Sequence, residues 1–505
     1  MELKKAEQTI QQPHVVCVPY PGQGHINPMM QLVQLLHSTG IHITLVHSEF
    51  DHSRISKSRG SQHSPSTRPD GFRIETIPDG LPPNDREAMR HIPTLCDSIR
   101  KKACLAPFRE LVMRLNDSAD SSRVSCIVSD GVMTFTQEVA EELGIPNVVF
   151  WTTGACGLMA YIYCRELIKR GLAPLKDESY LNNGYLDTTI DWIPGMGEIR
   201  FEDMPSFIRS TDPNNDIMLN FMLDEAHNTF KAPAIVLNTF DELEYDVITA
   251  MRSMSSHVYT TGPLSMLCRH MPNYHQFKSM GWNLWKEDIG CLEWLDSQES
   301  ASVIYVNFGS TTVVTAHHLS EFAWGLANSN HPFLWVIRSN LVVGDHAILQ
   351  DDFMAEIKGR GLLVSWCPQE EVLSHPSIGG FITHCGWNST IESICGGVPM
   401  ICWPFFAEQM TNRRYICKEW GIGMEIDANV RREEIENAVK ELMGRGEKGK
   451  EMMKNAMKWK ERATKAIEEG GSSYTNFYRL VNEIFMPRDH RISTGSAANA
   501  GTAVG

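Results

Sequence analysis

The sequence predicts an α/β protein built from two similar halves, each a parallel β-sheet with helices on both faces. Short apolar runs bounded by turn residues alternate with stretches of helical spacing over residues 14–151, and the alternation returns over 302–402. A polar, aperiodic stretch at 265–290 lies between the two series. Because parallel strands need a long crossover connection, usually a helix, this pattern favours two doubly wound sheets. Such a pair encloses a cleft, and ligands bind at the carboxyl ends of its strands.

The first half contains five clear strand candidates and two weaker ones. The first, HVVCVP, precedes a glycine turn and a helical pattern. Helical spacing also marks 104–116 and 134–143. The expected strands lie at 14–19, 41–47, 72–78, 125–130 and 147–151, with weaker candidates at 234–238 and 257–263.

The remaining segments set the expected domain boundaries. Residues 181–220 carry Gly, Pro, Asn and Asp without a clear period and predict a long loop, of the kind that often binds ligands. The second half reads as strands SVIYVNFGS, PFLWVIR, GLLVSW, GGFITH and VPMICW, followed by charged helices with a solvated face. We expect an N-terminal domain at 1–264, an interdomain linker at 265–300, a C-terminal domain at 301–470, a last helix at 471–490 and a disordered tail at 491–505.

The composition is that of an ordinary soluble globular protein, with 42% hydrophobic and 21% charged residues among 505. Its 46 basic and 61 acidic residues leave a net charge of −15, which disfavours binding to nucleic acid or to an anionic bilayer. No run approaches the roughly 18 apolar residues of a membrane span, and we expect no secretion signal. The 13 cysteines contain no CxxC pair and read as free thiols. We therefore expect a cytoplasmic enzyme.

A glycine turn after the first strand carries a candidate catalytic histidine. PGQGHINP at 21–28 matches two glycines of the dinucleotide fingerprint but has Asn27 in place of the third, so NAD binding is a weak alternative. His25 follows the strand end, where a neutral imidazole is a natural general base near pH 7; the alternative is a structural turn residue. Asp130 ends another strand of the same sheet and could orient His25. No G-x-S-x-G motif supplies a nucleophile for a hydrolytic triad.

Residues 366–409 are the most informative stretch of the second half. GGFITH reads as a buried strand, and the turn Cys385–Trp387 leads into a helix beginning near Asn388. A helix N-terminus with His384 beside it is suited to a diphosphate. The alternative is a capping box over Ser389–Glu392, which needs no ligand. These residues alone leave the ligand site and the helix cap equally open.

The two ends of this stretch hold further candidates for ligand contacts. Trp366 opens it and could stack on a flat base. Glu408 and Gln409 close it and could accept and donate hydrogen bonds to sugar hydroxyls. No HxxxH or DxD triplet lies in a metal-like setting, so we expect no metal.

The whole stretch resembles the signature box of plant secondary-product glycosyltransferases, the family-one UDP-sugar-dependent enzymes. The resemblance includes W-x-P-Q at 366–369, H-C-G-W-N-S at 384–389, Glu392 and the closing Glu-Gln at 408–409. It extends over nearly the whole chain, through GHINP at 24–28, SDG at 129–131, FWTTGA at 150–155 and VNFGS at 306–310. The segments 180–196 and 328–342 look most like the group-eighty-five branch, which includes enzymes acting on steviol, iridoid aglycones and cyanohydrins.

The resemblance implies a GT-B fold, two facing Rossmann-like domains with the last helix crossing back to the N-terminal domain. It implies that His25 is the general base and Asp130 its partner. In the donor site it implies uracil stacking by Trp366, contacts to base and ribose by Cys367 and Gln369, and ribose binding by Glu392. It implies diphosphate binding by Ser310, His384, Asn388 and Ser389, and sugar contacts by Thr152, Trp387, Glu408 and Gln409. Many members have Asp where Glu408 retains the carboxylate, and the final Gln usually accompanies glucose. No metal or cofactor is implied.

We therefore expect an inverting UDP-glucose-dependent O-glucosyltransferase that converts a hydroxyl of a small lipophilic terpenoid or cyanohydrin-type aglycone into a β-glucoside. An apolar acceptor pocket would be formed by Phe135, Trp151, Met159 and Tyr161, with His25 and Ala407 beside it; ordinary core packing is the alternative for each apolar side chain. We expect a monomer. The competing functions are a UDP-sugar epimerase or hydrolase, an NAD-dependent oxidoreductase, and an inactive protein that binds a small lipophilic ligand.

Overall fold

The sheet of the N-terminal half has seven parallel strands in the order β3-β2-β1-β4-β5-β8-β9. The computed structural model describes residues 12–59, 68–82, 90–118, 122–342, 351–444 and 446–486. Strands β1, β5 and β8 are buried along their whole length, as parallel strands covered on both faces require. The strands are β1 His14–Val18, β2 His42–Ser48, β3 Phe72–Ile77, β4 Val124–Asp130, β5 Asn147–Trp151, β8 Ala234–Leu237 and β9 Val258–Thr260.

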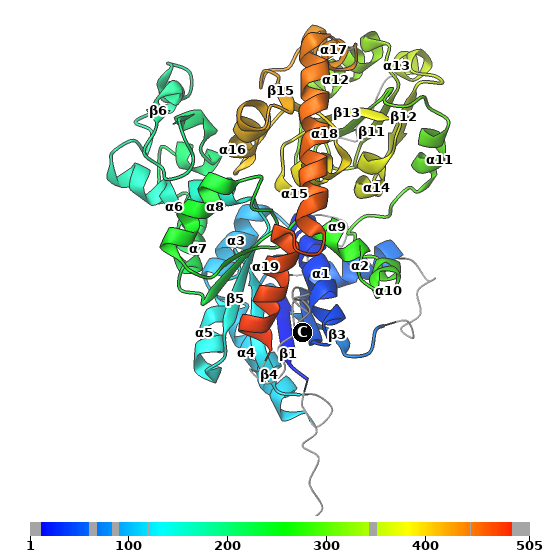
Figure 1. The fold of residues 1–505 in the computed structure, drawn as a ribbon. Coiled ribbons are helices and arrows are strands. Elements are labelled where there is room, and N and C mark those ends of the chain that lie inside the picture. The colour runs from blue at the N-terminus through cyan, green and yellow to red at the C-terminus, as the bar shows by residue number, and fades with distance from the viewer. Residues whose placement is uncertain are drawn as a thin grey trace, which may run out of the picture.

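The C-terminal half repeats this plan with six parallel strands in the order β12-β11-β10-β13-β14-β15. The two halves lie one above the other, with the strand ends of each facing the other half (Figure 1). This arrangement confirms the predicted pair of doubly wound α/β units. The strands are β10 Val303–Asn307, β11 Phe333–Val336, β12 Gly361–Val364, β13 Ile378–Thr383, β14 Met400–Cys402 and β15 Gly423–Glu425.

Helices cover both faces of each sheet, and three short ones fill the segment between the halves. The N-terminal half contains α1 Gln23–Ser38, α2 Glu49–Arg59, α3 Ile92–Arg100, α4 Leu105–Asp117, α5 Thr136–Leu143, α6 Ala155–Lys169, α7 Ile217–Thr229 and α8 Tyr245–Met254. The connecting segment contains α9 Leu264–Arg269, α10 Tyr274–Met280 and α11 Gly290–Asp296. The rest are α12 Ala316–Ser329, α13 Asp351–Glu356, α14 Gln369–Ser374, α15 Trp387–Gly396, α16 Gln409–Arg414, α17 Arg432–Met443, α18 Glu447–Ile467 and α19 Ser472–Leu480.

Each sheet has one point where the strand order reverses along the chain. In the first sheet this switch point lies between β1 and β4, and in the second between β10 and β13. The connections leave such a point toward opposite faces and open a crevice at the carboxyl ends of the two strands. The fold therefore marks two places for ligands, and they face each other.

Two segments differ from the sequence prediction. The expected loop at 181–220 contains an antiparallel pair, β6 Thr189–Ile190 with β7 Ile199–Arg200, and short 3₁₀ turns at Tyr185–Asp187, Phe201–Asp203 and Ser206–Arg209. Elements of two to four residues are too short to leave a period in the sequence. The expected linker at 265–300 is helical, and its helix α9 packs on α1 through a 3.2 Å hydrogen bond from Gln34 Nε2 to the Cys268 carbonyl.

The C-terminal helices join the two halves. Helix α18 descends from the C-terminal half, and α19 lies against the N-terminal sheet (Figure 1). The Asn476 amide donates to Thr260 Oγ1 at 2.8 Å, and the Tyr259 hydroxyl donates to Glu483 Oε2 at 2.5 Å. The crossing back implied by the resemblance is thus present, whereas the tail at 491–505 lies outside the described residues.

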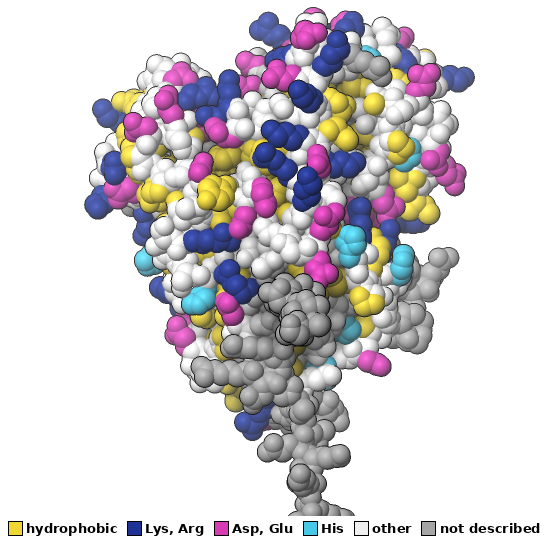
Figure 2. All heavy atoms as spheres, viewed as in Figure 1, with side chains coloured by type: hydrophobic (Ala, Val, Ile, Leu, Met, Phe, Trp, Pro, Cys, Tyr) yellow, Lys and Arg dark blue, Asp and Glu magenta, His cyan; other side chains and the backbone are white. Residues whose placement is uncertain are grey.

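The exposed face of α18 carries mainly charged side chains. Lys and Arg gather along this helix in Figure 2, and its buried residues are mostly small ones such as Ala456, Ala463 and Ala466. This is the solvated face that the Lys- and Glu-rich sequence predicts. Within the described ranges, no helix is both long and apolar enough to cross a membrane.

Candidate active site

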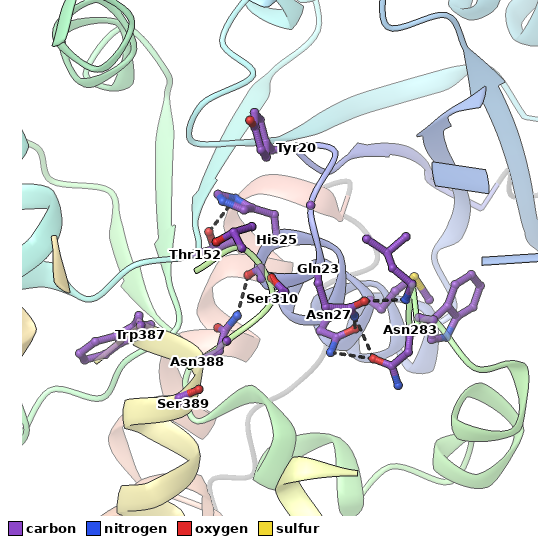
Figure 3. Close-up of a pocket in the computed structure, with 18 of the residues that line it drawn as sticks. Tyr20, Gln23, His25, Asn27, Thr152, Asn283, Ser310, Trp387, Asn388 and Ser389 are labelled. Carbon is purple, nitrogen blue, oxygen red and sulfur yellow. Dashed lines mark hydrogen bonds between the residues drawn. The ribbon is translucent and has the colours of Figure 1, made fainter. Parts of the chain in front are cut away.

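His25 and Asp130 meet at the switch point of the first sheet. His25 lies in the first turn of α1, which starts at Gln23 shortly after β1, and Asp130 is the last residue of the neighbouring strand β4. The His25 Nδ1 atom lies 2.8 Å from Asp130 Oδ2. It also lies 2.9 Å from the Thr152 hydroxyl (Figure 3). Because a carboxylate only accepts hydrogen bonds, Nδ1 carries the proton and the ring's lone pair is on Nε2.

The surrounding carboxylates tune the basicity of His25. Burial lowers the pKa of His25, but the attraction of Asp130, and more weakly of Glu408, outweighs burial and holds the pKa above 6.5. Asp130 is 1% exposed, and its Oδ1 accepts a hydrogen bond from the Val132 N–H at 3.1 Å, which fixes the carboxylate. A histidine oriented in this way is suited to take a proton from a hydroxyl.

A cavity of about 500 Å³ lies between the two halves and collects most of the predicted site residues. Part of its N-terminal wall is an apolar patch, as a pocket for a small lipophilic molecule requires, and polar residues from α1 and α2 lie beside that patch. That wall includes Tyr20, Ile92, Leu95, Val132, Trp151, Phe207, Met218, Phe221 and Met222. The other predicted residues that line the cavity are His25, Thr152, Ser310, Trp366, Cys367, Gln369, His384, Trp387, Asn388, Ser389, Glu392, Ala407, Glu408 and Gln409.

Two predicted pocket residues lie elsewhere. Phe135 is not at the cavity wall: its ring packs edge-on against Phe108 in the core, with centroids 5.9 Å apart. Met159 on α6 is likewise fully buried away from the cavity, whereas Tyr161 lines it. Residues two apart on a helix point about 200° apart, so α6 can present only one of Met159 and Tyr161 to the cavity. Periodicity within the helix alone does not tell which one.

Trp366 is held at the wall by a residue of the connecting segment. Its ring stacks on Trp285, with centroids 4.8 Å apart and planes inclined by 25°. Its carbonyl accepts a hydrogen bond from the Asp288 N–H at 2.9 Å. Cys367 follows it, with the Tyr305 hydroxyl 3.2 Å from its sulfur. Stacking on Trp366 by a uracil ring stays a prediction, and this packing holds the indole in place for it.

The structure contradicts the helix-cap interpretation of Ser389–Glu392. Helix α15 begins at Trp387 with Gly386 as its N-cap and no side-chain cap, so Ser389 already lies within the first turn. Ser389 Oγ and Glu392 Oε2 instead both accept hydrogen bonds from Gln369 Nε2, at 2.9 and 2.7 Å. Burial raises the pKa of Glu392. A buried carboxyl held by an amide at the cavity wall fits the predicted contact with ribose hydroxyls.

Ser310 and His384 meet at the switch point of the second sheet, after β10 and β13. The imidazole packs closely on two backbone turns, because a Cβ at Gly309 or Gly386 would lie 2.5 or 2.4 Å from its Nε2. Gly309 also has φ +75°, a conformation that favours glycine. Among the described residues, the buried His384 Nδ1 has no hydrogen-bond partner. The Nε2 end of the ring lies beside Gly386, the N-cap residue of α15, where an anion would bind.

Asn388 and Trp387 connect the two halves at the same place. Asn388 Nδ2 donates to the Gly24 carbonyl at 2.6 Å, one residue before His25 (Figure 3). The Trp387 indole N–H donates to the Asn238 carbonyl at 2.8 Å. The N-terminus of α15 is therefore fixed directly against the turn that carries His25 in the other half.

Glu408 and Gln409 lie at the start of α16, and each already makes hydrogen bonds within the protein. Glu408 Oε2 accepts from the Tyr161 hydroxyl at 2.8 Å. Gln409 Oε1 accepts from the N–H groups of Phe405 and Phe406 at 2.9 and 3.2 Å. Gln409 therefore keeps its NH₂ group as the donor for a ligand, and Glu408 keeps an acceptor oxygen.

Sequence reasoning missed the connecting segment as part of the cavity. Trp282, Asn283, Leu284 and Glu287 line it, and Asn283 Oδ1 accepts from Gln23 Nε2 at 2.9 Å (Figure 3). The available signal was WNLW at 282–285, two tryptophans within an otherwise polar stretch. Within the described part of the chain, no three His, Cys, Asp or Glu side chains are grouped as a metal site.

Two facing Rossmann-like halves with a cleft between them form the GT-B fold, and this cleft has a paired histidine on one side and a helix N-terminus on the other. The chain belongs to the UDP-glucoronosyl and UDP-glucosyl transferase family, whose model matches residues 24–469. It is therefore a UDP-glycosyltransferase.

The most informative relatives are plant glucosyltransferases. The chain is 55% identical over 481 residues to the (R)-mandelonitrile beta-glucosyltransferase of Prunus dulcis, covering 95% of this chain and 99% of the relative. It is 56% identical over 471 residues to the 7-deoxyloganetin glucosyltransferase of Gardenia jasminoides, covering 93% and 97%. It is also 52% identical to linamarin synthase 1 of Manihot esculenta, covering 94% and 97%.

Solved structures show the same fold. A UDP-glucose: anthocyanidin 3-O-glucosyltransferase in complex with UDP superposes with a TM-score of 0.77 at 29% identity, covering 93% of this chain and 98% of the other. Os79 of O. sativa in complex with UDP gives a TM-score of 0.75 at 27% identity, covering 92% and 98%.

Proposed function

We propose that the protein transfers glucose from UDP-glucose to a hydroxyl of a small lipophilic plant metabolite, with inversion to a β-glucoside. The observation that carries the proposal is the position of His25. Its described hydrogen bonds all go to Nδ1, and it lines the cavity between an apolar wall and the nucleotide-type side. Relatives that glucosylate mandelonitrile and 7-deoxyloganetin support the same class of acceptor.

In the proposed reaction, His25 Nε2 takes the proton of the acceptor hydroxyl as its oxygen attacks the anomeric carbon. Asp130 stabilises the imidazolium that forms, because its carboxylate lies 2.8 Å from Nδ1. The C1–O bond to UDP breaks on the opposite face of the sugar, and the electron pair stays on the diphosphate. The transition state has oxocarbenium character, and general base catalysis of this kind contributes roughly 10²–10⁴-fold in rate.

We propose that the leaving diphosphate is stabilised by the protein itself, without a metal or another cofactor. The N–H groups at the start of α15, the Ser310 hydroxyl and the His384 imidazole, whose Nε2 end lies beside the N-cap residue Gly386, support this proposal. Transfer should then continue at an unchanged rate in EDTA, and restoration of a lost rate by Mg²⁺ would contradict the proposal.

The acceptor is proposed to be neutral and largely apolar. Its side of the cavity is formed mainly by aromatic and aliphatic residues, while carboxylates of Asp130 and Glu408 lie near the base. A carboxylate acceptor would be repelled beside these two groups, whereas the guanidinium groups of Arg54 and Arg90 lie farther along the same cavity wall. Terpenoid and cyanohydrin-type alcohols meet these requirements. We further propose that the enzyme acts as a monomer in the cytoplasm.

Incubation with UDP-[¹⁴C]glucose and (R)-mandelonitrile, followed by a panel of terpenoid alcohols, tests the function. Labelled β-glucoside is the expected product, with its configuration checked by NMR. Free glucose or an epimerised UDP-sugar in the absence of any acceptor would instead favour a hydrolase or an epimerase. Failure of every alcohol in the panel, with UDP still bound, would contradict the proposed acceptor class.

A further inference from the structure

The residue before the predicted sugar contacts has an unusual backbone conformation. Ala407 has φ +61°, in the left-handed region that L-residues with a Cβ disfavour. The conformation directs the chain from β14 into α16, so that Glu408 and Gln409 line the cavity. A residue in this region persists only where surrounding contacts hold it.

Those contacts come from the other half of the molecule. The Ser206 N–H donates to the Ala407 carbonyl at 3.0 Å, and the Ala407 N–H donates to Ser206 Oγ at 2.8 Å. Ser206 begins a short turn of the N-terminal half, and the next residue, Phe207, lines the cavity. Both polar backbone groups of Ala407 are thus bonded to one residue of the opposite domain.

A second set of contacts fixes the same segment to α16. The Thr411 hydroxyl donates to the Asp203 carbonyl at 2.6 Å. The fully buried Asp203 carboxylate pairs with Arg413 at 2.6 Å and accepts from the Arg200 N–H at 2.8 Å. Truncating one partner of such a buried charge pair is strongly destabilising. The turn at 203–206 is therefore firmly held and can in turn hold Ala407.

We propose that Ser206, supported by Asp203, is a positioning residue for donor-sugar recognition: it holds Ala407 in the left-handed conformation that aims Glu408 and Gln409 at the sugar. The inference rests on the proposed function. It predicts that discrimination between UDP-glucose and its 4-epimer UDP-galactose depends on a contact between the two halves. UDP recognition should not depend on it, because Trp366 and Glu392 lie on other elements.

The test compares Ser206→Ala with two matched variants. Ser206→Thr keeps the hydroxyl, and Ser210→Ala removes a hydroxyl of the same segment that bonds only locally, to the Asp212 N–H at 3.3 Å. For each, kcat/KM is measured with both donors and (R)-mandelonitrile, and calorimetry gives the affinities for UDP, UDP-glucose and UDP-galactose. Loss of one hydrogen bond should reduce the glucose preference of Ser206→Ala by about threefold to tenfold. Ser206→Thr and Ser210→Ala should retain it, and UDP affinity should stay within twofold throughout.

A uniform fall in activity with both donors would overturn the proposal, since it would show general structural damage. An unchanged preference in folded Ser206→Ala, or a wild-type enzyme that does not discriminate the donors, would overturn it as well. If the wild type transfers no glucose at all, the proposed function fails; the calorimetric ratio of the two UDP-sugars then decides the positioning role separately.

Discussion

Both sheets place a histidine at their switch point, yet the two imidazoles lie in opposite electrostatic surroundings. In the N-terminal half, the Asp130 carboxylate holds the pKa of His25 above its ordinary value against the effect of burial. In the C-terminal half, burial, reinforced by the Arg338 guanidinium, lowers the pKa of His384 to about 4. Arg338 is 2% exposed and donates to the Thr312 carbonyl and to Asn340.

This difference separates two tasks that one fold must perform. A histidine next to a carboxylate can accept a proton and stay charged while the acceptor attacks. A neutral histidine near a cation keeps one N–H to donate, and the whole region favours the binding of an anion. The same topology therefore places a base on one side of the cavity and a neutral histidine suited to an anion site on the other, because Asp130 raises the pKa of His25 while burial and Arg338 lower that of His384.

The largest expected effect comes from removing the base. His25→Ala should reduce glucosyl transfer by roughly 10²–10⁴-fold while leaving UDP affinity nearly unchanged, because the nucleotide site lies in the other half. Initial rates and UDP calorimetry on the same preparation measure both quantities. His37→Ala, near the end of the same helix, is the matched control and should stay active. Near wild-type transfer by His25→Ala would refute the mechanism.

Asp130→Ala should be less damaging, at roughly 10- to 100-fold, because it removes the carboxylate that orients and charges the imidazole without removing the base. The pH dependence of kcat/KM tests the role of Asp130 more specifically than the rate alone. The base must be unprotonated, so kcat/KM falls as pH drops through the raised pKa of His25. Losing Asp130 lowers that pKa, and the acid limb should move to lower pH. If the acid side of the kcat/KM profile does not move in the variant, a group other than His25 determines that pH dependence.

Glu392→Ala tests the opposite half. The ribose contact predicts that UDP and UDP-glucose affinities both fall by about tenfold or more, as the loss of a buried acceptor does. Because α15 starts at Trp387 without a side-chain cap, a thermal melt should show little change from the loss of capping. Unchanged UDP affinity would exclude the ribose role.

Gln409→His tests the predicted contact with the donor sugar, and it should change activity less than the preceding variants do. The wild type should prefer UDP-glucose over UDP-galactose about tenfold to a hundredfold, since an axial hydroxyl leaves a buried polar group unpaired at ~1–3 kcal/mol. The variant should transfer glucose more slowly and show a reduced preference. Competition between the two donors with one acceptor measures the ratio. Equal use of both sugars by the wild type would contradict the assignment.

Much of the fold could be predicted from the sequence because its strands are continuous apolar runs. Strand ends indicated that His25 and Asp130 lie at the same sheet edge, and the family resemblance supplied their roles. Strand β15 was missed because three residues, Gly423–Glu425, carry no pattern. The predicted helix cap was three residues too late, since Gly386 and not Ser389 is the N-cap. Contacts between distant segments, such as Trp285 on Trp366 or Ser206 on Ala407, leave no local signal in one sequence.

The contrast between the two histidines can be measured directly by NMR titration of imidazole-labelled protein. His25→Ala and His384→Ala identify the two signals by their loss. The account predicts that His25 titrates above 6.5, whereas His384 stays neutral down to about pH 5 in the unliganded protein. In Asp130→Ala the His25 titration should move to lower pH while that of His384 stays in place. A His384 that titrates at or above His25 would contradict the division of roles between the two halves.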